Sequence, residues 1–317
     1  PNVLHKVSPD IICVDNVILF PAIKRYAREQ NKPWVRIISC SENEIADPSI
    51  PPHLSGCGEN DAACFAAYQD HFNEVVKPTH DKFNDFLAQC DEAAYPLGEF
   101  FEASPHMNLL LYPESVKFKR SQPLDPKQFQ YLEGCVRDES TFEMPSFKRH
   151  NDAPLLYVSF GSLGSGDTVL LKRLMEVVAT MTVRALFNVG DYEAEYDAVP
   201  DNIQIASWYP QPSVISQADA VIHHGGNNSF NECLYFGKPA LIMPYVWDGH
   251  DNARRVAETG HGFHLHRNHW TPDELQTTIE NLLSNQQLRV RLNTTSAHMR
   301  SEHGPTKAAG ILEQLLN

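Results

Sequence analysis

Short apolar runs alternate with longer stretches of helical periodicity along the whole chain. Each run is bounded by Gly, Pro, Asp or Asn, a pattern typical of strands that are buried in a parallel sheet. Between the runs, apolar residues recur three or four positions apart, as they do on helices that cover a sheet. The alternation predicts an α/β protein with doubly wound parallel sheets. The predicted strands are residues 10–14, 34–38, 107–112, 129–132, 155–160, 185–189, 203–206, 220–222 and 240–243.

The length of 317 residues predicts two domains, each with its own core. Residues 135–153 mix charge, Ser, Pro and His without periodicity, which is typical of an interdomain linker. We therefore expect a first domain over residues 1–134 and a second over residues 154–317. The second ends in helices predicted at 272–283, 286–300 and 306–316.

The first predicted domain contains a long loop followed by a long helix. Residues 40–60 are punctuated by Pro and Gly, which predicts a long loop, and we assign this loop to a ligand site. Residues 61–92 have helical periodicity that Pro78 interrupts. An apolar stripe on this helix is more often core than ligand contact, and it consists of Phe65, Tyr68, Phe72, Val75 and Val76.

The most informative stretch of the sequence is residues 218–256. An apolar run at 220–222 passes into His-His-Gly-Gly at 223–226 and then into a helical pattern, which Gly237 and Pro239 end. A glycine turn that leads into a helix leaves the first N–H groups of the helix unpaired, at the positive end of its dipole. This arrangement predicts an anion site, and phosphate is its usual ligand.

Polar side chains in the first turn of this helix suit a nucleotide. Asn227, Asn228 and Ser229 can bind phosphate oxygens, and His224 adds a donor just before the turn. Glu232 lies one turn after Ser229, about 5–6 Å away between Cβ atoms, where a carboxylate can accept from a ribose diol. In the alternative, the short side chains only cap the helix, Glu232 is a solvated acid and His224 is packed. One such residue alone favours the alternative, whereas the set in this order favours the nucleotide.

At this point the sequence resembles the donor-binding signature of family-one nucleotide-sugar glycosyltransferases, which have the two-domain GT-B fold. The resemblance is strong over about forty-five residues, because many motif positions match in order. It extends more weakly over most of the chain. The matching segments are Trp208-Tyr209-Pro210-Gln211, His224 to Ser229, Ser229 to Glu232, Gly237-Lys238-Pro239, and Pro244, Asp248, Asn252 and Ala253.

The resemblance implies roles for the base and ribose contacts. In that family the residue that matches Trp208 stacks on the nucleotide base, and the one that matches Gln211 hydrogen-bonds it. Glu232 matches the ribose ligand. The nucleotide is then expected to be UDP or dTDP, with UDP preferred.

The resemblance also implies the diphosphate and sugar contacts. His224, Asn228 and Ser229 match residues that bind the diphosphate, and Gly226 belongs to the same turn. Asp248 matches the acid that holds hydroxyl groups of the donated sugar. The glutamine that normally follows this acid is replaced by a glycine here, which leaves the identity of the sugar open.

A second glycine turn follows the strand predicted at 155–160. It spans residues 161–166, and Asp167 is a suitable N-cap for the next helix. Glycines let a backbone approach a diphosphate closely. Ser162 matches the loop serine of the family on this side, although the turn by itself is a weak signal. The core face of the following helix is predicted to be Leu170, Leu174 and Val178.

Asp15 ends the first predicted strand, at the edge where ligands gather in open α/β sheets. It could equally be a turn aspartate that caps a helix. The resemblance favours a catalytic role, because the matching acid orients a catalytic histidine that lies near the amino terminus in the family. That histidine is absent, so we expect the first domain to be incomplete and name no base. Four early histidines are not expected to replace it: His5, His53, His71 and His80.

Composition narrows the possible partners. The formal charge of −14 argues against nucleic acid as a ligand and against binding to an anionic membrane surface. No apolar run approaches the ~20 residues of a membrane span, and no signal peptide opens the sequence.

Seven cysteines without metal spacing predict reduced thiols in a cytoplasmic protein. A cluster of four histidines lacks a carboxylate or cysteine that would complete a ligand set, so we expect no metal and no cofactor beyond the nucleotide sugar. The clustered residues are His261, His264, His266 and His269.

Together these observations predict an inverting, metal-independent glycosyltransferase that moves a sugar from a nucleoside diphosphate to a hydroxyl group of a small molecule. Two alternatives remain: a nucleotide-sugar epimerase, and a donor-binding module without catalysis, which would be a partner subunit or a catalytically inactive paralogue. A missing amino-terminal segment or a partner chain is the further partner that we expect. A product formed without an acceptor would favour the epimerase.

Overall fold

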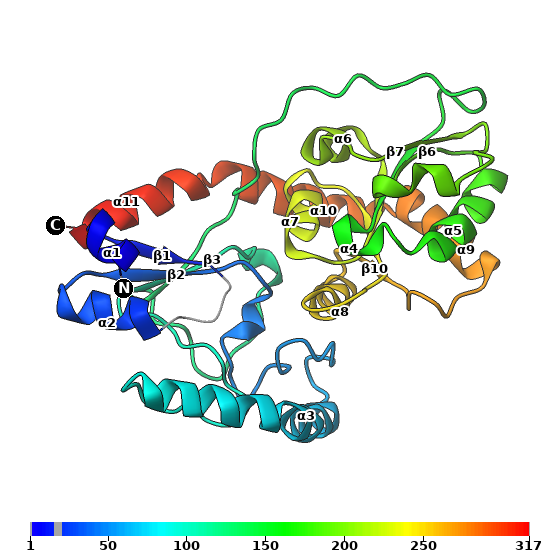
Figure 1. Ribbon diagram of the computed structural model, residues 1–317. Coiled ribbons are helices and arrows are strands. Elements are labelled where there is room, and N and C mark those ends of the chain that lie inside the picture. Colours follow the sequence, from blue (N-terminus) through cyan, green and yellow to red (C-terminus); the bar gives the residue numbers. More distant parts are fainter. Residues whose placement is uncertain (1, 16–20, 317) are drawn as a thin grey trace. The chain divides into compact units, whose positions relative to one another are not determined.

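The computed structural model describes residues 2–15 and 21–316, and they form two compact units. The first unit comprises Pro1–Cys135 together with His303–Asn317, and the second comprises Val136–Glu302. The carboxyl-terminal residues therefore belong with the first unit, whereas the sequence pattern assigned them to the second domain. Figure 1 shows the elements of both units, which are described separately below.

The first unit is built on a four-stranded parallel sheet with the strand order β1-β2-β3-β4. In its register, Ile12 pairs with Trp34, and Val35 pairs with Met107. Its strands are β1 (Ile12–Val14), β2 (Trp34–Ile38), β3 (Met107–Leu110) and β4 (Phe129–Tyr131). Its helices are α1 (Asn2–Val7), α2 (Pro21–Glu29), α3 (Ala62–Gln89) and α11 (Gly304–Leu316), with single 3-10 turns η1 (Glu42–Glu44) and η2 (Glu114–Val116).

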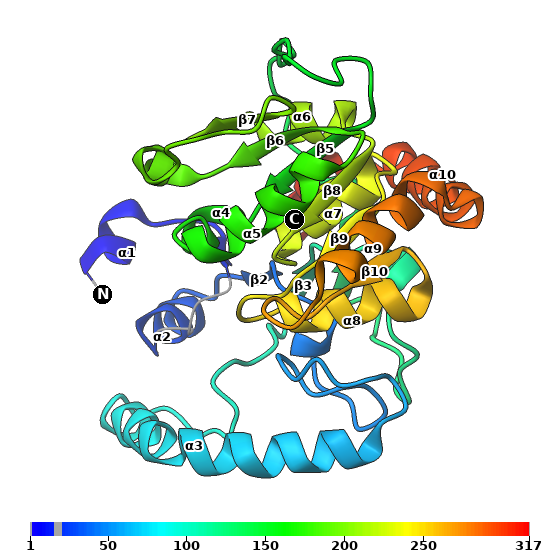
Figure 2. The same ribbon diagram turned by 90° about the vertical axis from the view of Figure 1, so that its right-hand side faces the viewer.

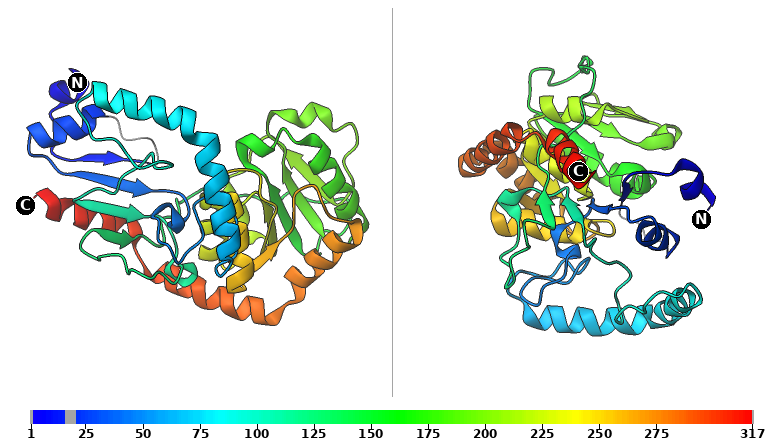
Figure 3. Two further views of the ribbon diagram at one scale, coloured as in Figure 1. Left: turned by 90° about the horizontal axis from the view of Figure 1, so that it is seen from below. Right: turned by 90° about the vertical axis from the view of Figure 1, so that its left-hand side faces the viewer.

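The last helix covers one face of this sheet. Ile311, Leu312 and Leu315 of α11 pack against buried Val35 and Leu109. In Figure 3 this helix, in red, lies alongside the strands of the first unit. The predicted final helix is therefore present, and its apolar face helps to build the core of the first unit.

The long helix α3 differs from the sequence expectation. Pro78 lies inside a continuous helix, and only His80 and Leu87 are buried among its residues. Val75 on the apolar stripe is 61% exposed. The expectation that the stripe is core is wrong, because helical periodicity shows which residues share a face but not what covers that face.

The expectation of seven reduced thiols is also wrong, because Cys57 and Cys64 form a disulfide. The bond joins the loop before α3 to the first turn of that helix, where Asp61 accepts a hydrogen bond from the Cys64 N–H as its N-cap. Among the described helices, none has the length and apolar character that a membrane span needs.

The second unit has a six-stranded parallel sheet in the order β10-β9-β8-β5-β6-β7, seen in Figure 2. Counted within the unit from β5, this is the order 3-2-1-4-5-6 of a dinucleotide-binding fold. Its strands are β5 (Leu155–Ser159), β6 (Arg184–Asn188), β7 (Ile203–Ala206), β8 (Ala220–His223), β9 (Ala240–Ile242) and β10 (Gly262–His264). The other elements are α4 (Gly161–Gly164), α5 (Thr168–Thr180), η3 (Gly190–Glu195), α6 (Gln211–Gln217), α7 (Asn227–Tyr235), α8 (Gly249–Thr259), α9 (Pro272–Ser284) and α10 (Gln286–Ser301).

Local sequence explains several boundaries of these helices. Asp167 caps α5 by accepting from the Leu170 N–H at 3.1 Å, as its position predicts. Gly237 follows α7 with a φ of +65°, which a residue without a side chain adopts readily. The predicted core face of α5 is buried, and it consists of Leu170, Leu174 and Val178.

Residues 136–154, all of which the structure describes, contain no helix or strand. They nevertheless pack against the core of the second unit. Phe142, Met144 and Phe147 contact the core cluster that includes Tyr209 and Val214. The Phe142 N–H donates to Ser213 Oγ at 2.7 Å. We call residues 136–149 the connecting segment.

Candidate functional site

The candidate site lies where the strand order of the second unit reverses, between β5 and β8. The two strands are neighbours, and Ser159 pairs with His223 at their carboxyl ends. The chain leaves β5 through Gly161 and leaves β8 through Gly225. In open α/β sheets a ligand binds in the crevice between two such loops. The two predicted glycine turns therefore lie side by side in the fold.

The ring of His224 lies between two of these glycines. A Cβ on Gly161 would come within 2.9 Å of His224 Cε1, and a Cβ on Gly226 would come within 2.5 Å of His224 Nε2. Both contacts are closer than real Cβ contacts, so only glycine leaves room for the imidazole. Burial lowers the pKa of His224, which therefore has a neutral ring at neutral pH.

Gln211, at the start of α6, joins two residues of α7. Its Nε2 donates to Ser229 Oγ at 3.1 Å and to Glu232 Oε2 at 2.6 Å, and the Tyr157 hydroxyl donates to its Oε1 at 3.4 Å. Glu232 is 4% exposed, so its description as a solvated first-turn acid is wrong. The structure thus brings together three residues that are predicted to bind base, phosphate and ribose.

The capping alternative for the first turn of α7 is not supported. Gly226 is the N-cap, and no side chain makes a capping hydrogen bond there. Asn228 is exposed, whereas Ser229 is buried and bonded to Gln211. The first N–H groups of this nine-residue helix therefore have no side-chain cap.

Asp248 is held at the start of α8 and is buried. Asn252 donates through Nδ2 to the Gly225 carbonyl at 2.8 Å, and the same atom lies 3.4 Å from Asp248 Oδ2. Asn252 therefore ties the loop after β8 to the acid that is predicted to hold the sugar. The sequence contained Asn252 as a motif position, but its structural role could not be predicted without the contact to Gly225.

Two predicted contact residues are exposed at the rim. Trp208 is 65% exposed, so it does not fill the core, and its exposed ring suits a surface that stacks on a base. Ser162, in the short helix α4 after β5, is also exposed.

Asp15 lies in the first unit, one residue after the end of β1. It is exposed, and the Ser39 hydroxyl donates to its Oδ1 at 2.8 Å. Ser39 follows β2, so the two carboxyl-terminal strand ends are linked by this bond. Residues 16–20, on which the alternative of a helix cap at Asp15 depends, lie outside the described residues.

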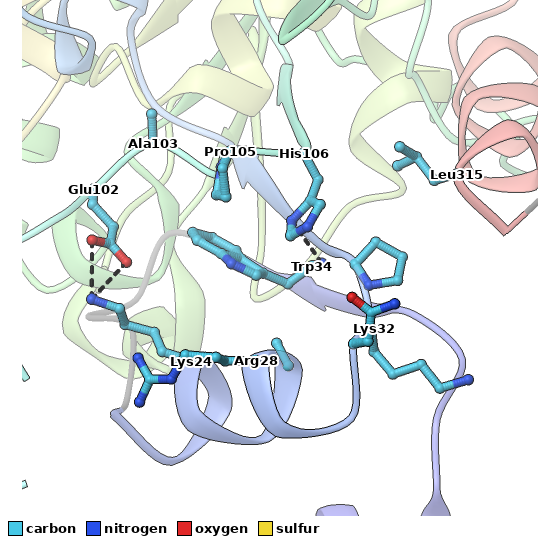
Figure 4. A pocket seen from close by; sticks show the side chains of 12 residues that line it. Lys24, Arg28, Lys32, Trp34, Glu102, Ala103, Pro105, His106 and Leu315 are labelled. Atoms are coloured by element: carbon cyan, nitrogen blue, oxygen red, sulfur yellow. Dashed lines mark hydrogen bonds and ion pairs between the residues drawn. The ribbon is translucent and has the colours of Figure 1, made fainter.

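A groove of the first unit lies at the opposite edge of its sheet (Figure 4). It has a volume of about 740 Å³ and lies around Trp34 and His106, which precede or begin strands. Catalytic groups in this kind of sheet gather at the other strand ends. Its cations are also neutralised: Lys24 pairs with Glu102 at 3.0 Å, Arg28 with Glu92 at 3.2 Å, and Lys32 with Asp10 at 2.8 Å.

The histidines that cluster late in the sequence have structural contacts. His261 lies between the hydroxyls of Thr259 and Thr295, with both distances 2.9 Å. The rings of His266 and His269 stack with their centroids 4.1 Å apart. Over residues 2–15 and 21–316, no group of three or more His, Cys, Asp or Glu side chains is arranged to hold a metal ion.

A comparison with known protein families supports the placement of the candidate nucleotide-sugar site in the second unit. Residues 171–315 match the family described as erythromycin biosynthesis protein CIII-like, C-terminal domain. This match includes α7 and α8, which carry most of the candidate site.

Two characterised relatives are glycosyltransferases by name. NDP-glycosyltransferase YjiC of Bacillus subtilis is 24% identical and aligns with 98% of this chain and 73% of its own length. Aclacinomycin-T 2-deoxy-L-fucose transferase of Streptomyces galilaeus is 26% identical over 64% of this chain and 46% of its own length.

Solved structures have the same fold. The glycotransferase of kitacinnamycin superimposes with a TM-score of 0.78 at 20% identity, over 100% of this chain and 78% of the other. Glycosyltransferase VinC in complex with dTDP has a TM-score of 0.65 at 20% identity, over 99% and 74%.

Proposed function

We propose that this chain, which has the GT-B fold, is a family-one glycosyltransferase that transfers a sugar from UDP or dTDP to a hydroxyl group of a small molecule. The observation that carries the proposal is the convergence of Gln211, Ser229 and Glu232 beside the two glycine turns. A nucleotide needs such a combination of an amide, an uncapped helix start and a buried acid.

The donor would lie along the crevice in a fixed direction. Trp208 would stack on the base, Gln211 would hydrogen-bond it, and Glu232 would accept from the ribose diol. The diphosphate would lie at the start of α7, near His224, Ser229 and the Ser162 turn. Asp248 would hold hydroxyl groups of the sugar.

The reaction would proceed with inversion, by direct attack of the acceptor oxygen on the anomeric carbon. The bond from that carbon to the diphosphate breaks as the new glycosidic bond forms, and a base takes the hydroxyl proton. The N–H groups that begin α7 would stabilise the negative charge that develops on the departing diphosphate. Helix N–H groups and the His224 ring supply this stabilisation without a metal ion.

Asp15 would act on the acceptor side by orienting the group that serves as the base. Its carboxylate accepts from Ser39, which helps to fix the direction of the carboxylate at the end of β1. We name no residue as the base.

The direct test is titration of the chain with UDP and with dTDP, measured by calorimetry. Charged, hydrogen-bonded contacts contribute ~1.5–3 kcal/mol, so Glu232→Ala is expected to weaken nucleotide binding by about tenfold or more. Glu176→Ala, on the exposed side of α5, is a matched control that should leave binding unchanged. Equal affinities of wild type and Glu232→Ala would refute the assignment of the ribose site.

A second experiment separates catalysis from binding alone. Incubation with a nucleotide sugar and a panel of small hydroxyl acceptors should release the free nucleoside diphosphate and form a glycoside. Tight nucleotide binding without either product across the panel would instead favour a donor-binding module.

A further inference from the structure

The connecting segment reaches the candidate ribose site through its first residues. Arg137 Nη1 lies 3.7 Å from Glu232 Oε1, and Arg137 Nε lies 2.6 Å from Glu139 Oε1. The sequence assigned these residues to a linker without a function. In the structure they are the charged groups that the connecting segment brings next to Glu232.

The position of Arg137 is fixed by anchors further along the segment. Phe142 packs edge to face on Tyr209, with ring centroids 5.5 Å apart, and its carbonyl accepts from Gln217 Nε2 at 3.0 Å. Tyr209 in turn contacts Tyr157, whose hydroxyl donates to Gln211. The segment and the site residue Gln211 therefore share one packed cluster, so Arg137 is held near Glu232 by a defined structure.

Glu232 is a buried acid that must be ionised to accept two ribose hydroxyls. Burial raises the pKa of Glu232, while the hydrogen bond from Gln211 and the charge of Arg137 lower it and Glu139 raises it. Tyr157 and Cys233 are the other titratable groups whose charges interact with it. Arg137 is thus the cation that compensates this carboxylate.

Arg137 and Glu232 differ in solvent exposure, and this difference determines whether their ion pair affects stability or the charge state of the acid. Arg137 is 55% exposed and the Glu232 side chain 5%. An ion pair with both partners in water contributes little to stability. Here one partner is desolvated, so the cation acts mainly on the charge state and direction of the acid.

We propose that Arg137 is a positioning residue of the donor site, which keeps Glu232 ionised and directed toward the diol of the bound nucleotide. The connecting segment is then part of the donor site. This inference rests on the proposed function, because it requires Glu232 to be the ribose ligand. Glu139 competes for the same guanidinium and opposes its effect.

The test is a calorimetric titration of the full chain with UDP at pH 6, 7 and 8. Arg137→Ala is expected to weaken binding roughly threefold to tenfold at pH 6 and less at pH 8, because a larger share of Glu232 is protonated at low pH without the cation. Arg137→Lys keeps the charge and should bind within about twofold of wild type. Glu139→Gln should bind UDP at pH 6 at least as tightly as wild type.

These variants separate positioning from a merely structural role. A structural defect would weaken binding by the same factor at every pH and would affect Arg137→Lys as well, and either result would overturn the inference. Weaker binding by Glu139→Gln at pH 6 would also overturn it. If wild type binds neither UDP nor dTDP, the proposed function itself fails. If wild type binds and Glu232→Gln does not, but Arg137→Ala matches wild type, only the role of Arg137 fails.

Discussion

Gly249 packs directly against the main chain of His224, so that a Cβ at position 249 would lie 2.5 Å from the His224 carbonyl oxygen. The contact is reciprocal, because a Cβ on Gly225, whose φ is +90°, would lie 2.7 Å from the Gly249 carbonyl oxygen. The start of α8 and the loop after β8 thus touch through their backbones. This geometry leaves no room for a side chain at the position where the family signature has a glutamine, directly after the acid that is proposed to hold the sugar.

Restoring that glutamine should therefore harm the protein. Gly249→Gln is expected to lower the free energy of unfolding by ~1–3 kcal/mol, because the Cβ meets backbone that cannot turn away. It should also weaken binding of a nucleotide sugar. Gly310→Ala in α11, where a Cβ meets nothing within 4 Å, is the control. Denaturant unfolding and donor titration measure both effects, and tighter sugar binding by Gly249→Gln would contradict this account.

Asn252 is expected to matter for stability and for the sugar. Asn252→Ala leaves the buried Gly225 carbonyl without its side-chain donor, which should lower the free energy of unfolding by ~1–3 kcal/mol. Because Asn252 also contacts Asp248, the KM for the nucleotide sugar should rise more than the Kd for the free nucleotide. The exposed Asn281 in α9 is a matched control, for which an alanine substitution should change neither value.

Trp208 should affect binding and not folding. Base–aromatic stacking contributes ~1–3 kcal/mol, so Trp208→Ala should weaken UDP binding by about tenfold or more, and Trp208→Phe by less. The unfolding curve of Trp208→Ala should match that of wild type, because the Trp208 side chain is 65% exposed. Trp247 is equally exposed and precedes Asp248, the acid proposed to hold the sugar, so Trp247→Ala should leave the affinity for UDP unchanged. A larger loss with Trp247→Ala would reverse the proposed direction of the donor.

The parallel sheets were predictable because buried strands have a strong local signature. The strands at Trp34–Ile38 and Ile203–Ala206 have the predicted bounds, and most others differ by one or two residues. Helix α6 was missed, because Gln211-Pro212-Ser213 resembles a turn until the helix is seen to begin at Gln211 with proline in its first turn.

The residues of the candidate site could be predicted from the sequence, but the hydrogen bonds between them could not. Periodicity placed Ser229 and Glu232 on one face of a helix, yet the bond from Gln211 to both depends on how α6 packs. Arg137 gave no local signal, because a charged residue in an irregular stretch is usually solvated. Long-range contacts of this kind follow from tertiary packing, which a local pattern does not encode.

Buried histidines should make the second unit less stable in acid. Burial and the neighbouring His224 lower the pKa of His223 to about 3, and burial with Arg291 and Arg255 lowers that of His261 to about 4. Below a pH of about 6.5 the unfolded chain binds protons that the folded chain excludes. The free energy of unfolding should therefore fall as the pH decreases from about 6.5 to about 4, by ~1.4 kcal/mol per pH unit for each histidine.

Calorimetric unfolding between pH 7 and pH 5 measures this slope. His261→Gln should reduce the number of protons bound on unfolding by about one. It should also lower the stability at pH 7, because the contact with Thr295 changes. A slope that is the same with and without His261 would show that this histidine is not buried in its neutral form.

The disulfide determines how many cysteines can react with a thiol reagent. In denaturant without a reductant, five cysteines should react with a thiol reagent, and all seven should react after reduction. The loop it closes spans a sequence separation of seven, so reduction should destabilise the region around the start of α3 by about 2–3 kcal/mol in the chain-entropy account. Seven reactive thiols without a reductant would instead agree with the reduced, cytoplasmic protein that the cysteine pattern favoured.

Helix α11 completes the core of the first unit, although it is encoded after the whole of the second. On the ribosome, the sheet of β5 to β10 can form while the sheet of β1 to β4 still lacks the helix that covers one of its faces. The order of maturation is thus the reverse of the order of synthesis for the two units. Until α11 emerges from the ribosome, Val35, Met107 and Leu109 form an exposed apolar surface that chaperones can bind. A ribosome that stalls before α11 would leave this surface uncovered.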